Sequence, residues 1–481
     1  MDLSDTIAAV ATAPGRGGVA VVRVSGPDAF SVARRVAGSV PEPGRTSFAR
    51  FRRGDAVVDS GVVLSFASPR SYTGEDVVEL QCHGGSVAPR RVLEACIAAG
   101  ARLARRGEFT QRAFLNGKIG YEQAEAVLDF IDAKTDRAAD AAMAELDGQG
   151  AANCETDPVR SLYSSALELS STVEHALDVS EEDLGDAYFL ALSRSLSGFL
   201  SSVRDARRRL GERRLLRDGA LVVLAGPPNA GKSSLLNALL GEDRAIVSSV
   251  PGTTRDSIEA WLDVGGWPVR LVDTAGLRES ADSIEAEGVR RSEDLVSKAD
   301  VVVLLEPTES QVAGDSWFVS RLSAMALAKA AGSCPVKQSE QSRRSSSSHE
   351  PGTQSSSQTV KQSSTILVSS KCDVARGDGL NVSAVTGEGL DALRLEIAAR
   401  LERLAETSEA AEDDVSTIAR KSAALVEAEA ALAPFAAEAQ PDLVLLGNAL
   451  RRACVRLGEL SGSVYSEDLL DSLFSRFCVG K

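Results

Sequence analysis

The chain has 481 residues, too many for one hydrophobic core, so two or three domains are expected. Its formal net charge of -15 argues against a protein that coats nucleic acid broadly, because non-specific phosphate binding depends on Lys and Arg. Seven cysteines lie without paired spacing, as expected of reduced thiols. No apolar run approaches the roughly 18 residues that cross a bilayer, and residues 1–10 lack the basic region of a secretory signal. We therefore expect a cytoplasmic protein.

Residues 1–118 alternate short β-branched segments with helical segments, which is typical of an α+β domain. The expected strands and helices are residues 18–24, 61–66 and 76–81, and residues 28–36 and 88–99.

Helical periodicity rich in Ala, Leu and Glu begins near residue 119, continues to 217, and returns from 401 to 473. We expect one discontinuous α-helical domain, made of residues 119–217 and 406–481. Residues 218–405 would be inserted between its helices, because insertions are tolerated where chain ends lie close together.

Residues 204–217 are dense in arginine: Arg204, Arg207, Arg208, Arg209, Arg213, Arg214 and Arg217. A solvated helix face or a linker into the next domain is the favoured interpretation, and a local RNA contact is the alternative.

The run Gly226-Pro-Pro-Asn-Ala-Gly-Lys-Ser233 follows a strand-like stretch at 221–225 and opens a helix-like stretch at 234–240. This setting predicts a phosphate-binding loop, because glycines let backbone N–H groups and a helix N-terminus approach phosphate. Lys232 is expected to reach the β and γ oxygens, and Ser233 to offer its hydroxyl to Mg²⁺. The chain is therefore expected to bind a nucleoside triphosphate in an α/β P-loop domain.

Four further segments follow in the order of a guanine-nucleotide switch: Gly252-Thr-Thr-Arg-Asp256, Asp273-Thr-Ala-Gly276, Ser370-Lys-Cys-Asp373 and Ser383-Ala384. Asp373 can accept hydrogen bonds from both N–H groups of guanine, a pairing that adenine cannot supply. The first two segments are expected to face the γ-phosphate and Mg²⁺. The expected GTP-binding residues are Asn229, Ala230, Gly231, Lys232, Ser233, Ser234, Ser248, Ser249, Val250, Pro251, Gly252, Thr253, Thr254, Asp273, Thr274, Ala275, Gly276, Ser370, Lys371, Asp373, Ser383 and Ala384.

Two positions depart from the usual switch. Leu277 stands where Ras-type GTPases carry the glutamine that orients the attacking water, so another group must do so. Asn229 could ligate a monovalent cation together with carbonyls of residues 248–253, or it could merely cap the loop. Ser370 stands where asparagine is usual, which predicts a weaker grip on the nucleotide.

Residues 333–364 are rich in Ser, Gln and charged residues and lie between strand-like stretches at 301–305 and 365–368. We expect a disordered surface insertion, because this composition buries too little apolar surface to offset the cost of ordering. His349 lies in it and receives no catalytic role.

Seven motifs lie outside the nucleotide-binding segments. They are Asp5-Thr-Ile7, Ala13-Pro-Gly-Arg-Gly-Gly18, Ser71-Tyr-Thr-Gly-Glu-Asp76, Cys82-His-Gly-Gly85, Gly107-Glu-Phe-Thr110, Arg112-Ala-Phe-Leu-Asn116 and Phe477-Cys-Val-Gly-Lys481. In residue type and order they resemble the MnmE (TrmE) family, the GTPases of tRNA wobble-uridine modification. The resemblance covers nearly the whole chain except the Ser-rich insertion.

The resemblance implies a homodimer joined through N-terminal domains of a tetrahydrofolate-binding-like fold, residues 1–118. It implies a GTPase activated by potassium that acts with the FAD- and NADH-using partner MnmG (GidA) as a heterotetramer. Together they would attach an aminomethyl or carboxymethylaminomethyl group to C5 of the tRNA wobble uridine, position 34. The one-carbon unit would come from a tetrahydrofolate derivative in its 5-formyl or methylene form.

The resemblance also implies roles for particular residues. Potassium ligands fall on Asn229, Ser248, Val250 and Thr253, magnesium ligands on Ser233 and Thr254, the water-orienting glutamate on Glu285, folate contacts on Arg23, Glu79, Lys118 and Lys481, and a reactive thiol on Cys478. Without the resemblance, Glu285 and Arg23 are interpreted as surface charges, and Cys478 as either a nucleophile or a buried tail cysteine.

A second function remains open on the sequence: a ribosome-assembly or RNA-binding GTPase whose flanking domains dock without folate chemistry. Leu277 and the loop around Asn229 fit that function as well. Arg23, Glu79, Lys118 and Cys478 separate the two, because a docking module does not need them.

Overall fold

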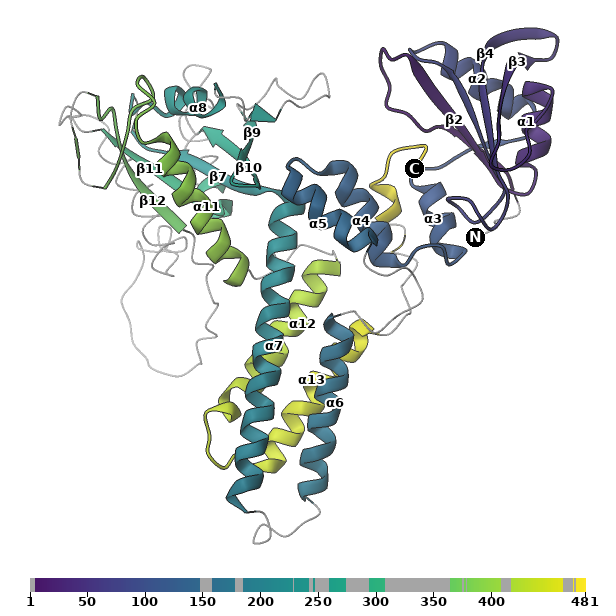
Figure 1. Cartoon of the computed structure of the whole chain (residues 1–481). Coiled ribbons are helices and arrows are strands. Elements are labelled where there is room, and N and C mark those ends of the chain that lie inside the picture. Colours follow the sequence, from purple (N-terminus) through teal and green to yellow (C-terminus); the bar gives the residue numbers. More distant parts are fainter. Residues whose placement is uncertain are drawn as a thin grey trace, which may run out of the picture. The chain divides into compact units, whose positions relative to one another are not determined.

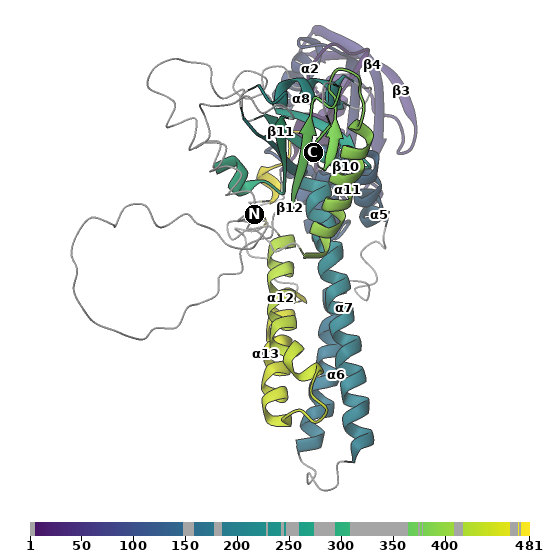
Figure 2. The same ribbon diagram turned by 90° about the vertical axis from the view of Figure 1, so that its left-hand side faces the viewer.

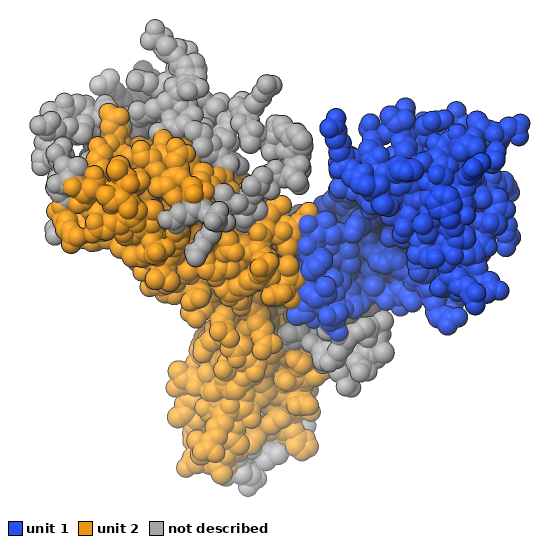
Figure 3. All heavy atoms as spheres, turned by 45° about the horizontal axis from the view of Figure 1, so that its top comes forward, with its two compact units in different colours: residues 1–131, 142–155, 463–481 blue, residues 132–141, 156–462 orange. Residues whose placement is uncertain are grey.

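The computed structural model of the chain divides into two compact units, which Figure 3 colours separately. Unit 1 contains residues 1–131, 142–155 and 463–481, and unit 2 contains residues 132–141 and 156–462. The structure describes residues 5–147, 158–177, 185–227, 229–241, 245–246, 259–273, 294–307, 364–373, 376–377, 379–407, 417–461, 470 and 473–481.

Unit 1 is built on a six-stranded sheet with strand order β3-β4-β5-β2-β1-β6. Its elements are β1 (Ile7–Val10), β2 (Val19–Ser25), α1 (Ala29–Ala37), β3 (Thr46–Arg53), β4 (Ala56–Phe66), β5 (Val77–His83), α2 (Ala88–Ala98), β6 (Arg102–Leu103), α3 (Glu108–Leu115) and α4 (Tyr121–Asp132). The β1–β6 pair is parallel and the other neighbours are antiparallel.

The register of β2 and β5 separates the two faces of this sheet. Arg23 lies opposite Glu79, whereas Val22, Val24 and Leu80 point to the other face, because side chains alternate along a strand. That second face is buried against α1 and α2 (Figure 1). The Arg23–Glu79 pair therefore belongs to the face that the two helices leave open.

Residues 473–481 complete unit 1. Phe474 and Phe477 pack with Tyr121 and Leu128 of α4 in one apolar cluster. The backbone N–H of Phe109 donates to the carbonyl of Lys481 at 3.2 Å. Residues 119–131 and 473–481, which the sequence analysis assigned to the helical domain, thus pack with the N-terminal sheet in unit 1. The three predicted domain boundaries stay a prediction.

Unit 2 contains a seven-stranded sheet with strand order β13-β12-β11-β7-β10-β9-β8. Its strands are β7 (Ala220–Ala225), β8 (Ala245–Ile246), β9 (Glu259–Val264), β10 (Trp267–Asp273), β11 (Val301–Pro307), β12 (Ser364–Ser370) and β13 (Leu380–Val382). The five strands from β13 to β10 in this order run parallel, and β9 and β8 are antiparallel to their neighbours. Every residue of β7 is buried, as expected for a parallel strand covered on both faces.

The helices of unit 2 surround this sheet and form a bundle. They are α6 (Pro158–Leu177), α7 (Asp186–Asp218), α8 (Lys232–Leu240), α11 (Leu390–Thr407), α12 (Thr417–Ala436) and α13 (Leu443–Ser461). Helix α5 (Asp136–Asp147) contributes its first residues to unit 2. Figures 1 and 2 both show α6, α7, α12 and α13 side by side, and these four helices share one apolar core.

Helix α7 contributes to two cores. Leu196 and Val203 lie in the core of the bundle, whereas Leu215 and Leu216 lie in the core beneath the seven-stranded sheet. Its arginines are largely engaged within unit 2. Arg204 and Arg207 pair with Glu429, Arg214 with Asp300, and Arg217 with Asp218. These pairs favour the helix-face and linker interpretation of residues 204–217.

The predicted fold class is confirmed. An α+β N-terminal part, a helical part interrupted in sequence and an inserted α/β part with a P-loop are all present. Residues 333–363 of the predicted insertion lie outside the described residues, and Ser364 begins β12. Within the described ranges, none of the helices combines the length and apolar character needed to cross a membrane.

Candidate functional site

The phosphate-binding loop lies at the carboxyl end of β7, where ligands bind in open parallel sheets. Gly226 has φ 149°, and a Cβ there would lie 2.6 Å from the Leu305 carbonyl oxygen, so only glycine fits. Gly231 has φ 88° and immediately precedes α8. Strand, loop and helix therefore take the arrangement that the sequence predicted.

Lys232 is buried in the loop and holds its backbone. Its Nζ donates to the carbonyls of Gly226 at 2.9 Å and Pro227 at 2.8 Å. The ammonium thus lies inside the loop that its own residues form. Asn229, three residues earlier, has φ 61° and an exposed side chain. Asparagine tolerates this left-handed conformation better than most residues do.

Ser233 and Asp273, two residues predicted to lie near Mg²⁺, are in direct contact. The Ser233 hydroxyl donates to the Asp273 Oδ2 at 2.6 Å, and Asp273 is buried at the end of β10. The two residues are 40 positions apart, and the parallel pairing of β7 with β10 places them at the same sheet edge. Residues 248–254, 274–276 and Glu285 lie outside the described residues.

The predicted base-recognition residues also converge. The Ser383 hydroxyl donates to Asp373 at 2.6 Å, and the backbone N–H of Cys372 donates to the Val382 carbonyl at 3.3 Å. Ser370, at the end of β12, is buried, and its hydroxyl reaches the Glu306 carbonyl only at 3.5 Å. Lys371 follows with φ 61°. The end of β12 and residues 383–384 therefore lie together at one edge of the candidate nucleotide site.

A second cluster lies on the open face of the unit 1 sheet. Arg23 bonds Glu79 at 2.9 Å, and its guanidinium lies 5.4 Å from the Tyr72 ring centre and 5.6 Å from that of Phe109. Burial lowers the pKa of Lys481, and the nearby Arg23 charge lowers it further. The Arg23–Glu79 pair thus lies beside two aromatic rings, and Lys481 is near enough to Arg23 for their charges to interact.

The other two residues predicted for this part of the molecule are Lys118 and Cys478. Lys118 donates to the carbonyl of Pro69 at 3.0 Å, in the loop that carries Tyr72. Cys478 is exposed, which argues against the alternative of a buried tail cysteine. The structure therefore brings Arg23, Glu79 and Lys481 together and places Lys118 at the adjoining loop.

Comparison with known proteins shows what the whole chain is similar to. The family model described as "GTP-binding protein TrmE N-terminus" matches residues 6–118, and that described as "MnmE helical domain" matches residues 122–478. The tRNA modification GTPase MnmE of Alkalilimnicola ehrlichii is 40% identical over 490 residues, covering 99% of both chains. That of Methylococcus capsulatus is 38% identical over 481 residues, again covering 99% of both.

The chain belongs to the MnmE family. It is a GTPase, and its family acts in tRNA modification. Among solved structures, the G domain of the Thermotoga maritima FeoB iron transporter is 24% identical, with a TM-score of 0.24, and the match covers 38% of this chain and 98% of that one.

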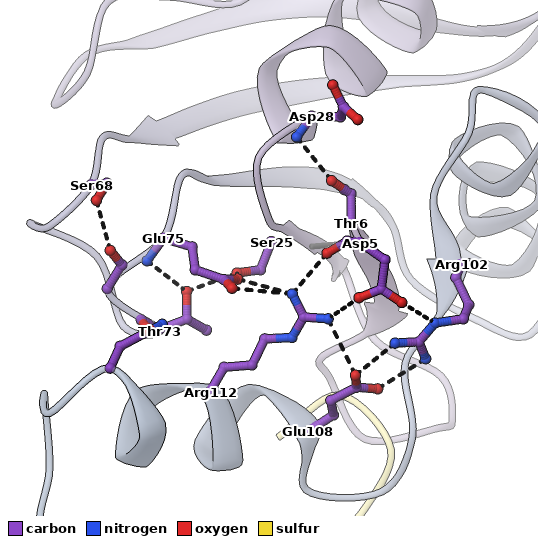
Figure 4. A network of polar contacts seen from close by, with 12 residues as sticks. Asp5, Thr6, Ser25, Asp28, Ser68, Thr73, Glu75, Arg102, Glu108 and Arg112 are labelled. Atoms are coloured by element: carbon purple, nitrogen blue, oxygen red, sulfur yellow. Dashed lines mark hydrogen bonds and ion pairs between the residues drawn. The ribbon is translucent and has the colours of Figure 1, made fainter. Parts of the chain in front are cut away.

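Sequence reasoning missed the buried network that supports the Arg23 face in this MnmE family member (Figure 4). Arg112 is fully buried and bonds Asp5 at 2.6 Å, Glu75 at 3.1 Å and Glu108 at 3.3 Å. Arg102 bonds the same Glu108 at 2.7 Å. Of these five residues, all but Arg102 lie within the family motifs.

The network fixes the pKa of its central carboxylate. Burial alone would raise the pKa of Glu108, but hydrogen bonds from Arg102 and the Arg105 backbone N–H, with Arg112, lower it to about 2. Asp5 also has a lowered pKa, chiefly because Arg102 donates to it. The motif residues around Arg112 are therefore structural: they hold α3, with its Phe109, against β1 and the 71–76 loop.

Tyr72 and Phe109 were likewise not predicted as site residues. The Tyr72 hydroxyl bonds the Thr110 hydroxyl at 2.9 Å, which fixes its ring beside Arg23. Both aromatic residues stand within quoted motifs, so the motifs held the signal. Their side-chain role required the pairing of β2, α3 and the 71–76 loop.

Proposed function

We propose that this chain is a potassium-dependent GTPase that drives modification of the tRNA wobble uridine, as a cytoplasmic homodimer with an MnmG-type FAD-dependent partner. The partner and this chain would form a heterotetramer that attaches an aminomethyl or carboxymethylaminomethyl group to C5 of uridine 34. Full-length similarity to MnmE supports the proposal. The observation that carries it is the occurrence of two sites in one chain: the Ser233–Asp273 pair and the Arg23–Glu79 pair.

For hydrolysis, we assign Mg²⁺ to Ser233 and Thr254, with Asp273 acting through water. A hydroxyl beside a carboxylate is a hard oxygen set of the kind that Mg²⁺ prefers, so the described residues fit this ion. Bound Mg²⁺ would neutralise charge on the β and γ oxygens. Lys232, already inside the loop, would exchange its two carbonyl acceptors for phosphate oxygens.

For potassium, we assign Asn229, Ser248, Val250 and Thr253. Asn229 supplies the ligand that lies in the described part of the chain, and its exposed amide has no loop-capping bond there, which favours the ligand interpretation over a cap. A cation at this position would supply the positive charge that an arginine finger gives other GTPases. Glu285 would orient the attacking water in place of the glutamine replaced by Leu277.

For the one-carbon unit, we assign a tetrahydrofolate derivative to Arg23, Glu79, Lys118 and Lys481. The donor and acceptor set fits the group: Glu79 can accept from the N–H pair of the pterin, and the cations can meet its carbonyl or its carboxylates. Tyr72 and Phe109 offer aromatic faces beside them. Cys478, exposed in the same tail as Lys481, is the proposed reactive thiol.

Nucleoside analysis of tRNA from a strain that lacks this chain tests the central assignment. The wobble-uridine modification is expected to disappear and to return with the unaltered gene. Intact modification in the deletion strain would refute the proposal.

Calorimetric titration of the intact protein with 5-formyltetrahydrofolate tests the folate site without relying on activity. Saturable binding is expected, and Glu79→Gln should weaken it about tenfold or more, because the amide cannot accept at both positions. Glu42→Gln, an exposed carboxylate elsewhere in unit 1, is the control. Binding that survives Glu79→Gln unchanged would remove folate from this cluster.

A further inference from the structure

The charge of this chain is distributed unevenly. Residues 1–118 contain 15 Arg, one Lys and 11 acidic residues, a net charge of +5, although the whole chain carries -15. The other 363 residues therefore carry -20. An opposite charge on one domain indicates a polyanionic partner for that domain.

Exposed arginines of this domain gather along one border of its sheet. Strand β3 is the edge strand, and α2 packs beside it (Figure 1). We call the resulting surface the β3 edge surface, and its arginines are Arg50, Arg52 and Arg53 of β3 and Arg90 and Arg91 of α2. Glu94 joins the two elements, because Arg53 bonds it at 2.9 Å and Arg90 lies 4.0 Å from it.

Few acidic groups balance these arginines. Glu94 is the carboxylate that pairs with Arg53 and Arg90, and Arg52 donates to the backbone carbonyl of Asp55 at 3.2 Å. Within the described part of the chain, Arg50 and Arg91 take part in neither a hydrogen bond nor an ion pair through their side chains. Unit 1 therefore has solvent-exposed guanidinium groups that do not bond to other groups of its own fold.

The position of two of them is unfavourable for the fold. Arg90 and Arg91 are the third and fourth residues of α2, whose first turn contains no acidic residue and no side-chain cap. Cations near a helix N-terminus face the positive end of its dipole and destabilise the helix. A local rule broken without a compensating interaction is expected at functional positions.

An aromatic side chain lies beside Arg50, on the face of β3 that turns away from α2. Phe48 of β3 is 74% exposed and points to the same face of the strand as Arg50, two residues on. Ala49 and Phe51 point the other way, into the core shared with α1 and α2. An arginine beside an exposed aromatic ring is typical of surfaces that bind RNA backbone and stack an unpaired base.

We propose that the β3 edge surface binds the phosphate backbone of tRNA, with Phe48 stacking on an unpaired base. Arginine predominates over lysine there, which favours phosphate, because the planar guanidinium bonds it through two N–H groups. The inference rests on the proposed function, since it names where that function's RNA substrate lies. The arginine-dense stretch of α7, by contrast, has most of its charges paired within unit 2.

Filter binding of an unmodified tRNA transcript to the full chain, over a series of salt concentrations, tests the proposal. The double variant Arg50→Gln/Arg91→Gln is expected to bind about tenfold or more weakly at about 100 mM salt. The slope of log K against log salt should become shallower by about two, because each arginine that neutralises a phosphate accounts for roughly one. Arg208→Gln/Arg209→Gln, two exposed arginines of α7, is the matched control and should leave both quantities unchanged.

Phe48 separates stacking from charge. Phe48→Ala should weaken tRNA binding about fivefold or more with the salt slope unchanged, and Phe48→Tyr should restore it. GTP hydrolysis without tRNA should be the same in all these variants, which shows that they fold.

Several results would overturn the proposal. One is an unaltered tRNA affinity in Arg50→Gln/Arg91→Gln, and another is a weakening confined to the α7 control. A third is the absence of tRNA binding by the unaltered chain at about 50 mM salt. The last is that Arg50→Gln/Arg91→Gln loses binding to phosphatidylglycerol vesicles but retains tRNA binding. Each leaves the proposed function standing, because nucleoside analysis of the deletion strain decides that separately.

Discussion

The guanidinium carbon of Arg137 lies 4.1 Å from the centre of the Trp267 ring, which is 1% exposed. Arg137 also pairs with Glu212 of α7, and the Thr135 hydroxyl donates to the Gly266 carbonyl at 2.8 Å. The start of α5 therefore contacts the turn between β9 and β10 and holds it in place. Strand β10 runs from this turn to Asp273, so the contact holds the hairpin at the end opposite to the Ser233–Asp273 pair.

Removing the arginine should loosen this hairpin. Arg137→Ala is expected to lower the free energy of local unfolding of β10 by about 1 to 2 kcal/mol, mainly because the guanidinium no longer stacks on the buried ring. The Glu212 pair contributes little, because both side chains are about a third exposed. Hydrogen exchange of the β10 amides measures the change. Arg194→Ala, at an exposed position of α7, should have no effect, and equal protection in both variants would contradict the prediction.

The Glu108 network predicts a specific acid sensitivity of unit 1. The folded state holds the Glu108 pKa at about 2, below its ordinary 4.5, so its stabilisation is complete above about pH 4.5 and is lost as pH falls toward 2. A shift of this size corresponds to about 3 kcal/mol. Glu108→Gln should therefore lower the melting temperature at neutral pH and flatten its decline as the pH falls from 4.5 to 2. A variant with the unaltered pH profile would assign the acid sensitivity to other carboxylates.

Potassium should accelerate GTP hydrolysis strongly over sodium. Asn229→Ala is expected to bring the rate in potassium down to the rate in sodium, because it removes the amide oxygen from the proposed cation site. Phosphate release in matched KCl and NaCl measures this, and Asn237→Ala on the exposed side of α8 is the control. Equal rates of the unaltered protein in both salts would exclude the cation mechanism.

Replacing Ser370 should strengthen the grip on nucleotide. Its hydroxyl reaches the Glu306 carbonyl at only 3.5 Å, and Ser370→Asn supplies a longer amide at the position where asparagine is usual. One added hydrogen bond of about 1 kcal/mol would lower the Kd for GTP about fivefold. Fluorescent GTP titration measures it, with Ser370→Ala as the partner variant. A Kd that stays the same or rises in Ser370→Asn would show that the site lacks room for the amide.

Local patterns were enough to predict some elements and not others. The strands at 18–24 and 76–81 were visible because they are short segments rich in β-branched residues, and the phosphate-binding loop because it is contiguous. Strand β3 was missed, since an edge strand carries charge at its outward positions and reads as a loop. The Arg112 network could not be predicted, because its partner Asp5 lies 107 residues away and only the folded pairing brings them together.

The packing of residues 473–481 against α3 and α4 sets the timing of assembly. Residues 5–131 of unit 1 are synthesised well before Phe474 and Phe477, which its apolar cluster needs and which follow residue 131 by about 340 residues. At roughly 5 to 20 residues per second, this part of unit 1 stays open for on the order of 20 to 70 s of synthesis. The chain of the GTPase sheet is complete within that interval, so this sheet can fold before Lys481 joins the Arg23 cluster.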